Sequence, residues 1–350
     1  MSASGFLPLC LTATSARTAV GDDSEETSAS IRARIVRLQE HPVYRSICPN
    51  GLGEPLATAR VDAVDPAALG AERLLTLLLP VLEDVMRRGD VSPFALQRTA
   101  LLVALPGPDA AVETWKLEES FLDTISHRLA LNFPVTRLSQ SGHSGVLELC
   151  AEASGLLTSG VVDTCVVAGV DSYLSADRMA LLDGQYRLKS QRNVDGFFPG
   201  EAAAALLFES EAHLEKRGAS ALAKLVAVGV ADEPETCAGE RPSSGRGLSG
   251  ALRAALGPEK AAFLLGDLNG ESYRSFEWGI VSARLGEAIA PSAKVMFPVL
   301  STGDVGAASG ALLVGLVAQA FRRGWAPLDE AIVWTSSDGP RRAAGRLRRP

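Results

Sequence analysis

The chain lacks the features that mark several protein classes. Its five cysteines are odd in number and show no C-x-x-C spacing, so we expect neither a disulfide framework nor a metal site. No apolar run reaches the length needed to span a bilayer. Acidic residues (41) outnumber basic ones (34), and the net charge of −7 argues against nucleic-acid binding.

The start of the chain does not resemble a signal peptide, and its basic end does not resemble a binding site. Residues 1–21 have no basic n-region and a broken apolar run, which is unlike a signal peptide. The basic run 341–350 is expected to be a solvated end. We therefore predict a cytoplasmic protein without metal or cofactor that binds neither membrane nor nucleic acid.

The segment from Gln140 to Leu174 organises the rest of the chain. Between Ser141 and Gly160 the only charges are Glu148 and Glu152, which predicts a helix buried on nearly all sides. The apolar, β-branched run 161–170 follows and is typical of a strand covered on both faces. A buried helix that leads into a buried strand favours a layered α/β protein.

The same pattern recurs near the C-terminus, where the nearly uncharged segment 303–321 leads into the apolar run 331–337. Aligning Ser144-Gly145 with Ser309-Gly310 brings both helices and both strands into register. This predicts an internal duplication with the two central helices packed together; chance similarity of two alanine-rich helices is the alternative. The halves are placed at 1–215 and 219–350, divided within a short exposed connection at 211–219.

Apolar periodicity and turn residues predict the remaining elements. Asp23 with Glu26 resembles a capping box that opens a helix over 26–40. Residues 41–65 are rich in Pro and Gly and are expected to be irregular. Further helices are predicted at 72–89, 121–131, 248–257 and 275–289, and strands at 5–16, 98–106, 202–210, 222–231 and 261–270.

In this order the features resemble the thiolase fold, and specifically the β-ketoacyl synthase family, over nearly the whole chain. Segment 141–172 is similar to the family's nucleophile segment, and 195–210 is similar to its D-G-F-x-x-G-E-G-A turn. The family's H-G-T motif corresponds in position to residues 267–279, and its G-H-x-x-G-A-A-G motif corresponds to residues 302–313. Its C-terminal glycine-rich loop corresponds to residues 336–344. The resemblance implies an α/β thiolase-like fold of five layers, α-β-α-β-α, built from two duplicated halves.

The catalytic side chains of the family are absent from the matching positions. The resemblance places Gly142 at the family's cysteine, Asn269 and Gly303 at its two histidines, and Pro298 at its lysine. A glycine cannot form an acyl-thioester, and Cys150 is too far along the helix to replace it. Claisen condensation by the usual route is therefore not expected.

Other polar residues gather at these positions, and they form the candidate pocket: His143, Ser144, Asn269, Glu271 and Asp304. His143, Ser144 and Asp304 could form a Ser-His-acid site. The reading we favour is that Ser144 and Asp304 cap their helices and that His143 fills the vacated pocket.

Further along the chain, Glu201 and Asp195 are interpreted as turn-stabilising residues. Phe197-Phe198 is interpreted as a core or dimer contact. Neither pair is expected to carry catalysis.

The sequence thus predicts a catalytically inactive ketosynthase-like protein that serves as a dimeric binding, scaffold or chaperone-like adaptor in a bacterial biosynthetic or secretion assembly. The alternatives are an acyltransferase or hydrolase that uses Ser144 or Ser141, and a non-catalytic partner subunit of a true ketosynthase. The expected partners are a second copy of the chain, with strand 161–170 at or next to the two-fold axis, and another protein subunit or an acyl carrier protein.

Overall fold

The computed structural model describes residues 6–239 and 241–350, so the predicted start of the first strand, at Gly5, lies outside the described residues. The first half of the chain supplies five strands in the order β1-β7-β6-β4-β5. The pairs β1–β7 and β7–β6 are antiparallel, whereas β6–β4 and β4–β5 are parallel. Their bounds are β1 Leu9–Thr18, β4 Thr99–Ala104, β5 Val135–Ser139, β6 Thr164–Ser172 and β7 Glu201–Glu209.

The second half repeats this topology, with the strand order β8-β12-β11-β9-β10. Again the first two pairs are antiparallel and the last two are parallel. The bounds are β8 Ala223–Asp232, β9 Ala261–Gly266, β10 Ile289–Met296, β11 Glu330–Ser336 and β12 Arg341–Arg348. One order and one set of directions in both halves confirm the predicted duplication.

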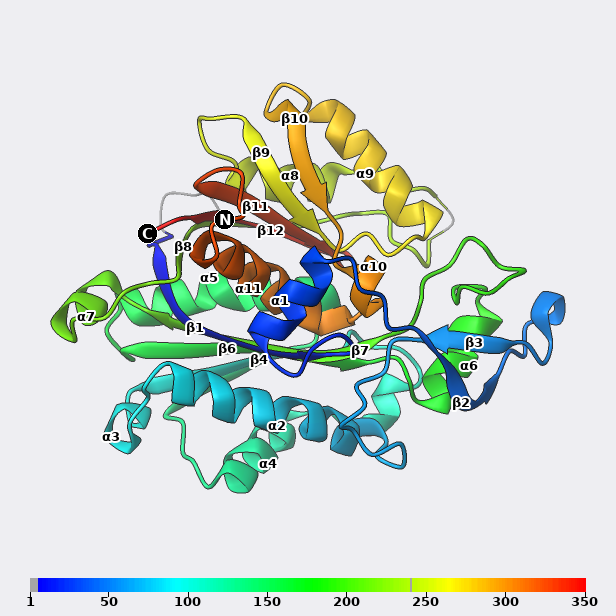
Figure 1. The fold of residues 1–350 in the computed structure, drawn as a ribbon, viewed down its shortest axis with the longest axis horizontal. Coiled ribbons are helices and arrows are strands. Elements are labelled where there is room, and N and C mark those ends of the chain that lie inside the picture. Colours follow the sequence, from blue (N-terminus) through cyan, green and yellow to red (C-terminus); the bar gives the residue numbers. More distant parts are fainter. Residues whose placement is uncertain (1–5, 240) are drawn as a thin grey trace.

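The elements form five layers, α-β-α-β-α (Figure 1). Helices α2 and α4 cover the outside of the first-half strands, α8 and α9 cover the outside of the second-half strands, and α5 and α11 lie between them. The two sets of strands join into one ten-stranded sheet where β1 pairs with β8 over Leu9–Leu11. The longer helices are α1 Ser24–Arg32, α2 Gly70–Arg88, α4 Glu119–Leu129, α5 Gly145–Thr158, α6 Ala176–Gly184, α8 Arg246–Ala255, α9 Ser272–Arg284 and α11 Ser309–Arg322. The shorter ones are α3 Pro93–Leu96, α7 Glu211–Lys216 and α10 Val299–Thr302, with 3-10 turns η2 Pro49–Gly51, η3 Val112–Trp115, η4 Gly142–Ser144 and η5 Gly306–Ala308.

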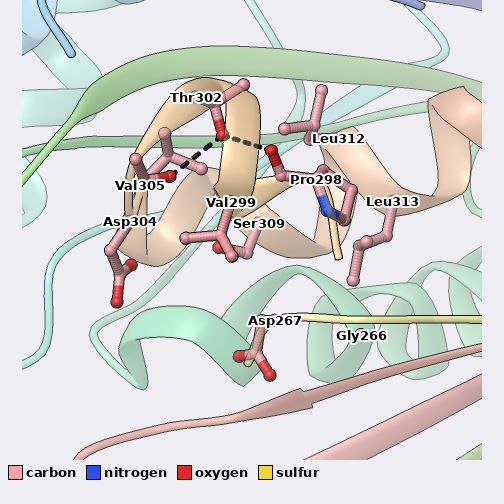
Figure 2. A pocket seen from close by; sticks show the side chains of 11 residues that line it. Gly266, Asp267, Pro298, Val299, Thr302, Asp304, Val305, Ser309, Leu312 and Leu313 are labelled. Atoms are coloured by element: carbon pink, nitrogen blue, oxygen red, sulfur yellow. Dashed lines mark hydrogen bonds between the residues drawn. The ribbon is translucent and has the colours of Figure 1, made fainter. Parts of the chain in front are cut away.

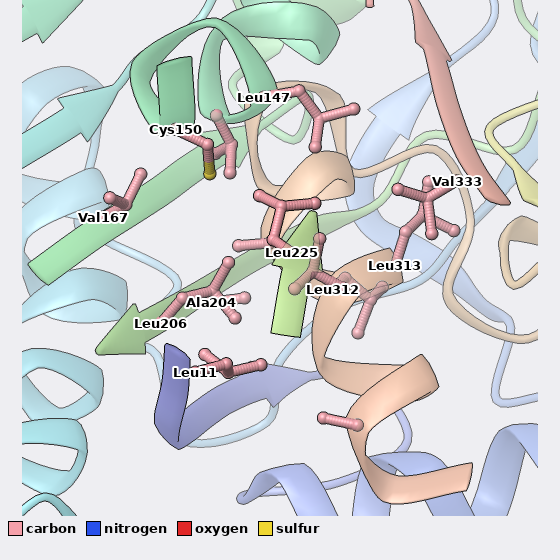
Figure 3. Packing of buried hydrophobic residues seen from close by; sticks show 14 of the residues in the cluster. Leu11, Leu147, Cys150, Val167, Ala204, Leu206, Leu225, Leu312, Leu313 and Val333 are labelled. Carbon is pink, nitrogen blue, oxygen red and sulfur yellow. The ribbon is translucent and has the colours of Figure 1, made fainter. Parts of the chain in front are cut away.

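The central helices approach each other closely because small residues line their contact. A Cβ added at Gly310 of α11 would lie 2.9 Å from the Cβ of Val146 on α5. Around this contact, Leu147 and Cys150 of α5 and Leu312 of α11 belong to one buried apolar cluster between the sheets (Figure 3). Burying each such leucine contributes about 1.5–3 kcal/mol, which explains why the apolar segments dominate the fold.

Two expectations for the N-terminal region are corrected. The helix predicted over 26–40 begins as expected, because Asp23 Oδ1 accepts from the Glu26 amide at 2.7 Å, but it ends at Arg32. The region 41–65, expected to be irregular, contains a hairpin of β2 (Gln39–Arg45) and β3 (Pro55–Thr58). A long-range contact stabilises this hairpin: the buried carboxylate of Asp183 on α6 accepts from the Tyr44 hydroxyl at 3.1 Å and from the Ile47 amide at 2.7 Å.

Three expectations for the second half are also corrected. The connection 211–219 contains a short helix, α7, and the helix predicted over 275–289 ends at Arg284 so that β10 can form the sheet edge. The C-terminal run 341–350, expected to be a solvated end, forms β12 between β11 and β8. Its basic character is tolerated because Arg342 is fully buried with its guanidinium Nε 2.9 Å from Glu277 Oε1.

The predicted role of strand 161–170 in dimerisation is corrected as well. Strand β6 pairs with β4 on one side and with β7 on the other, so it has no free edge to offer a second copy. The outer strands of the sheet are β5 and β10. β10 carries Pro291 and Lys294 and a register shift between Ile289 and Lys294, which are features that discourage edge pairing.

The division of the chain into 1–215 and 219–350 stays a prediction; it falls at the end of α7. Among the residues that the structure describes, no helix combines the length and the apolar character that crossing a membrane requires.

Candidate functional site

The two central helices begin next to each other. η4 precedes α5 and η5 precedes α11, and both turns lie at the carboxyl ends of strands. The Ala307 amide donates to Asp171 Oδ2 at the end of β6 (2.9 Å), and the Ser144 amide donates to Ser337 Oγ after β11 (3.0 Å). Ligand sites of α/β proteins commonly lie at this end of the strands.

Gly142, which the sequence resemblance places at the family's cysteine, has a left-handed backbone with φ +63°. The nearest atom that an added Cβ would meet is the Gly107 nitrogen at 3.4 Å, so a side chain would fit. This position therefore lacks a nucleophile although there is room for one.

The polar candidates on the neighbouring segments are brought together by hydrogen bonds. His143 is buried, and its Nε2 lies 2.8 Å from Asp304 Oδ1. Asn269 donates from Nδ2 to Asp304 Oδ2 at 2.7 Å and to Glu271 Oε2 at 2.9 Å. Four of the five candidate residues thus belong to one buried cluster, in which the Asn269 amide has both of its donors engaged.

Two arginines complete this cluster, and sequence reasoning missed both. Arg274 of α9 donates to Asp338 Oδ1 at 3.1 Å, and one of its guanidinium nitrogens lies 3.3 Å from His143 Nε2. Arg187 binds Glu271 through two hydrogen bonds of 2.7 and 2.9 Å, and it binds Asp338 in the same bidentate way at 2.9 and 3.1 Å. We call the set of His143, Arg187, Asp267, Asn269, Glu271, Arg274, Asp304 and Asp338 the ionic cluster.

The pKa values of the cluster follow from burial and from these partners. Burial opposes protonation of His143, but the carboxylate of Asp304 outweighs it and raises the pKa of His143. Burial would raise the pKa of Asp304, yet His143 and Arg274 hold it well below the usual range. Burial raises the pKa of Asp267, whose attraction to Arg274 does not fully compensate.

The serines do not form a catalytic triad with the His143–Asp304 pair. Ser144 is fully buried, and its hydroxyl donates to the carbonyls of Thr335 (3.2 Å) and Arg341 (3.1 Å). It sits at the N-cap of α5 without a side-chain capping bond, so the predicted capping role of Ser144 is wrong. The Ser141 hydroxyl donates to Glu148 Oε2 at 2.6 Å.

The predicted capping role of Asp304 is also wrong, because α11 begins after Ala308 without a side-chain cap; Asp304 Oδ1 accepts instead from the Gly306 amide at 2.9 Å, in the turn before the helix. Its neighbour Gly303 lies outside the cluster, with φ +65°. A Cβ there would lie 2.8 Å from the Phe198 carbonyl oxygen and 3.0 Å from the Ala59 Cβ. The backbone at 303 is therefore closed to a histidine.

Pro298, at the family's lysine position, lines a cavity of about 20 Å³ between β9, α10 and α11 (Figure 2). Thr302 donates from its hydroxyl to the Gly303 carbonyl at 2.9 Å on one side of this space. Asp267 also lines it, with an Oδ1 that makes no hydrogen bond within the described residues. A cavity of this size holds one or two water molecules and no substrate.

A second cavity, of about 560 Å³, opens on the other side of η4. It falls within the range of small-molecule sites. Gly142 and His143 form part of its wall; the other segments are the loop after β4, the end of β6, α6, the loop after β8 and the β11–β12 connection. Asn269, Glu271 and Asp304 do not line it.

Several ketosynthases are among the solved structures that share this architecture. A ketosynthase from module 6 of the bacillaene synthase of Bacillus subtilis 168 superposes with a TM-score of 0.81 at 14% identity, covering 98% of this chain and 72% of that one. The chain therefore has the thiolase-like fold of ketosynthases. An oxazolomycin ketosynthase domain from Streptomyces albus JA3453 gives a TM-score of 0.79 at 17% identity, with 98% and 75% covered.

A third similar structure is a chain of the AntDE:AntF complex. That complex is described as a type II PKS acyl-carrier protein in complex with its ketosynthase bound to the hexaketide. The match covers 99% of the present chain and 100% of the other one, with a TM-score of 0.79 and 14% identity. No protein-family model and no curated protein matches the sequence. At these identities the comparisons establish the ketosynthase fold alone.

The other residues singled out from the sequence have structural contacts. Glu201 is a buried anchor for α2 rather than a turn residue, because it accepts two hydrogen bonds from Arg73 at 2.7 and 2.9 Å. Asp195 accepts from the Ser272 amide at the start of α9 (2.7 Å). Phe197 is fully buried against Tyr173, which confirms a core contact for that phenylalanine.

Proposed function

We propose that this ketosynthase-fold protein is a catalytically inactive binding protein, which serves as a scaffold or chaperone-like adaptor in a bacterial biosynthetic or secretion assembly. The observation that carries the proposal is the ionic cluster. The polar side chains at the site of catalysis are bonded to one another, and position 142 bears no nucleophile. Oxyanion stabilisation needs donors that are free and aimed at the reacting atom, and here Asn269 donates to two carboxylates.

Condensation would also need a group that can carry the acyl chain. Cys150 is fully buried, and burial raises the pKa of its thiol far above neutrality, so it remains an inert thiol. The Ser144 hydroxyl is held by two carbonyls and makes no contact with His143. The arrangement supports binding without turnover.

Ser141 keeps an enzymatic alternative open, since it lines the large cavity and its hydroxyl donates to the Glu148 carboxylate at 2.6 Å. A serine beside a carboxylate could in principle be deprotonated by it. Arg341 Nε lies 3.2 Å from Glu148 Oε1, so the same carboxylate also forms an ion pair at the cavity wall. An acyltransferase or hydrolase based on Ser141 is therefore the second candidate.

We further propose that the protein acts as a homodimer that pairs through β5. This edge carries five residues without Pro or Gly, whereas the β10 edge carries Pro291 and Lys294. A second protein subunit, such as a true ketosynthase or an acyl carrier protein, is the alternative partner.

Intact-protein mass spectrometry after incubation with octanoyl-CoA, and with octanoyl-acyl carrier protein, tests the proposed inactivity. The expected result is an unchanged mass and no condensation product when a malonyl-thioester is added. A stable adduct on a serine or on Cys150, or any condensed product, would overturn the proposal.

A further inference from the structure

The charged side chains that line the 560 Å³ cavity are largely paired with one another. Arg178 donates to Asp171 Oδ1 at 2.5 Å and to Asp109 Oδ2 at 3.0 Å. Asp338 is held by Arg187 and Arg274 of the ionic cluster, and Arg341 lies 3.1 Å from Asp232. Because these carboxylates and guanidinium groups already have partners, none of them is the obvious recognition group for a ligand.

Tyr173 differs from this paired lining. Its side chain is 2% exposed and forms part of the cavity wall, and its hydroxyl makes no hydrogen bond within the described residues. Buried tyrosines usually find a partner for the hydroxyl. The Tyr173 hydroxyl is not one of the fully enclosed polar atoms, so a water or a ligand atom in the cavity can reach it. An unpaired phenol at the wall of a ligand-sized cavity is therefore a group that a ligand can satisfy.

The ring of Tyr173 is held firmly in place. Phe197 packs against it edge-on with ring centroids 5.2 Å apart, and the Arg178 guanidinium lies 4.0 Å from the ring centroid on its face. A cation over the face and an aromatic ring at the side leave the phenol little freedom. The hydroxyl is thus preorganised for a bond of fixed direction.

The charges around the hydroxyl determine to which kind of ligand atom it can donate a hydrogen bond. Burial, and then the carboxylates of Asp304 and Asp171, raise the pKa of Tyr173 well above its usual value. The phenol therefore stays protonated, and it donates a hydrogen bond at every physiological pH. Four carboxylates and three guanidinium groups line the cavity, so its wall carries no surplus of positive charge that would favour an anionic acceptor.

We propose that Tyr173 is the specificity-determining residue of this cavity and donates its hydroxyl hydrogen to an uncharged carbonyl oxygen of the ligand. The proposal rests on the proposed binding function, and it adds that the ligand class is an amide, ester or thioester rather than a free carboxylate or an amine. The apolar part of such a ligand would pack on Leu181 and Leu182 of α6, which line the same cavity.

Three probes of equal length test this assignment: hexanamide, hexanoate and hexylammonium, with dissociation constants measured by ligand-observed NMR. Hexanamide is expected to bind most tightly. Tyr173→Phe keeps the ring and its packing, and it should weaken hexanamide about threefold to tenfold while leaving hexylammonium unchanged, as expected for one lost hydrogen bond. Tyr44→Phe is the matched control, because its hydroxyl bonds Asp183 outside the cavity, and it should change neither probe.

Equal hexanamide affinity in the wild type and in Tyr173→Phe would overturn the assignment, and so would tighter binding of hexanoate or failure of all three probes to bind. None of the probes can acylate the protein. A negative result here is therefore distinct from a failure of the proposed inactivity, which only the thioester experiment detects.

Discussion

The buried pair of His143 and Asp304 gives a prediction whose size and pH dependence follow from the structure. We consider His143→Gln, Asp304→Asn and the double variant, with the free energy of unfolding measured for each. The 2.8 Å bond joins groups that are each 3% exposed, so solvent screens it little. A hydrogen bond between charged groups contributes about 1.5–3 kcal/mol and a neutral one about 0.5–1.5 kcal/mol, so we expect a coupling energy of about 2 kcal/mol while both groups are charged.

The pKa shifts set the pH range of this coupling. The pKa of His143 is raised in the folded protein, so its contribution is fully present below the unfolded value of about 6.5 and is lost as the pH rises through the folded value. The pKa of Asp304 is lowered, so its contribution is present above about pH 3.9 and is lost as the pH falls through the lower folded value. Both groups are charged near pH 5.5, and the coupling should fall to about 1 kcal/mol once the pH has risen through the folded pKa of His143 and the imidazole is neutral.

Urea unfolding at pH 5.5 and at pH 9 provides the measurement. The pair of Arg98 and Asp163 is the matched control, since both side chains are more than a third exposed and neither titrates between these pH values. Its coupling should be weaker than that of the buried pair and the same at both pH values. A His143–Asp304 coupling below about 0.5 kcal/mol at pH 5.5, or one larger at pH 9 than at pH 5.5, would refute the reasoning.

Four further outcomes are expected. Gly142→Cys should fold, with a free energy of unfolding lower by about 1–2 kcal/mol because the residue has a left-handed backbone. The new thiol should accept an octanoyl group from octanoyl-CoA without condensing it. Intact-protein mass and product analysis would reveal any condensed product. A fluorophosphonate probe should label neither Ser141 nor Ser144, and peptide mapping of one labelled serine would favour the hydrolase alternative. Arg342→Met should cost about 3–5 kcal/mol in urea unfolding because it leaves Glu277 buried and unpaired, whereas Arg348→Met at a half-exposed site should cost below about 0.5 kcal/mol; equal losses would contradict this. Light scattering should give the mass of a dimer at micromolar concentration, and a stable monomer would exclude the homodimer.

The elements that were predicted well share one property, which is that their own residues determine them. Helix α5 and strand β6 are apolar on nearly all sides, and so are α11 and β11. Such segments are stable only in the protein interior. Their repetition in the chain was enough to predict the duplication and the packing of the central helices.

The elements that were missed depend on partners far away in the chain. Strand β12 carries four arginines in eight residues, and it enters the sheet because Glu277, 65 residues earlier, compensates the buried Arg342. The β2–β3 hairpin depends on Asp183, about 140 residues later. From local composition alone, both segments are predicted to be exposed at the surface. A single sequence does not distinguish a charge that is buried and paired from one that is solvated.

The site shows the same division. The order of the motifs predicted that His143 and Asp304, which are 161 residues apart, lie in one pocket. This succeeded because each residue lies just before one of the two central helices, and these helices begin next to each other. Arg274 was missed because an arginine on an amphipathic helix is ordinarily exposed. Tyr173 was missed because its significance lies in a hydroxyl without a partner, which only the folded structure reveals.

The charge balance of the ionic cluster explains why His143 is important beyond filling space. Four carboxylates face two arginines, which leaves a surplus of two negative charges (4 − 2), and a protonated His143 reduces that surplus to one (4 − 3). Uncompensated buried charge is strongly destabilising, so the carboxylates themselves favour the protonated imidazole. Protonation of Asp267 can neutralise the remaining negative charge, because burial raises the pKa of this carboxylate.

The same arrangement opposes substitutions that would supply the histidines of condensation chemistry. A histidine placed at position 269 would remove the two bonds that Asn269 donates to Asp304 and Glu271, and one at position 303 would collide with the Phe198 carbonyl. Each single change would therefore disturb the buried structure before it could supply a catalytic group, the first by removing two hydrogen bonds and the second by a backbone clash. Several substitutions would have to occur together, which is why we expect Gly142→Cys alone to restore an acyl acceptor and nothing more.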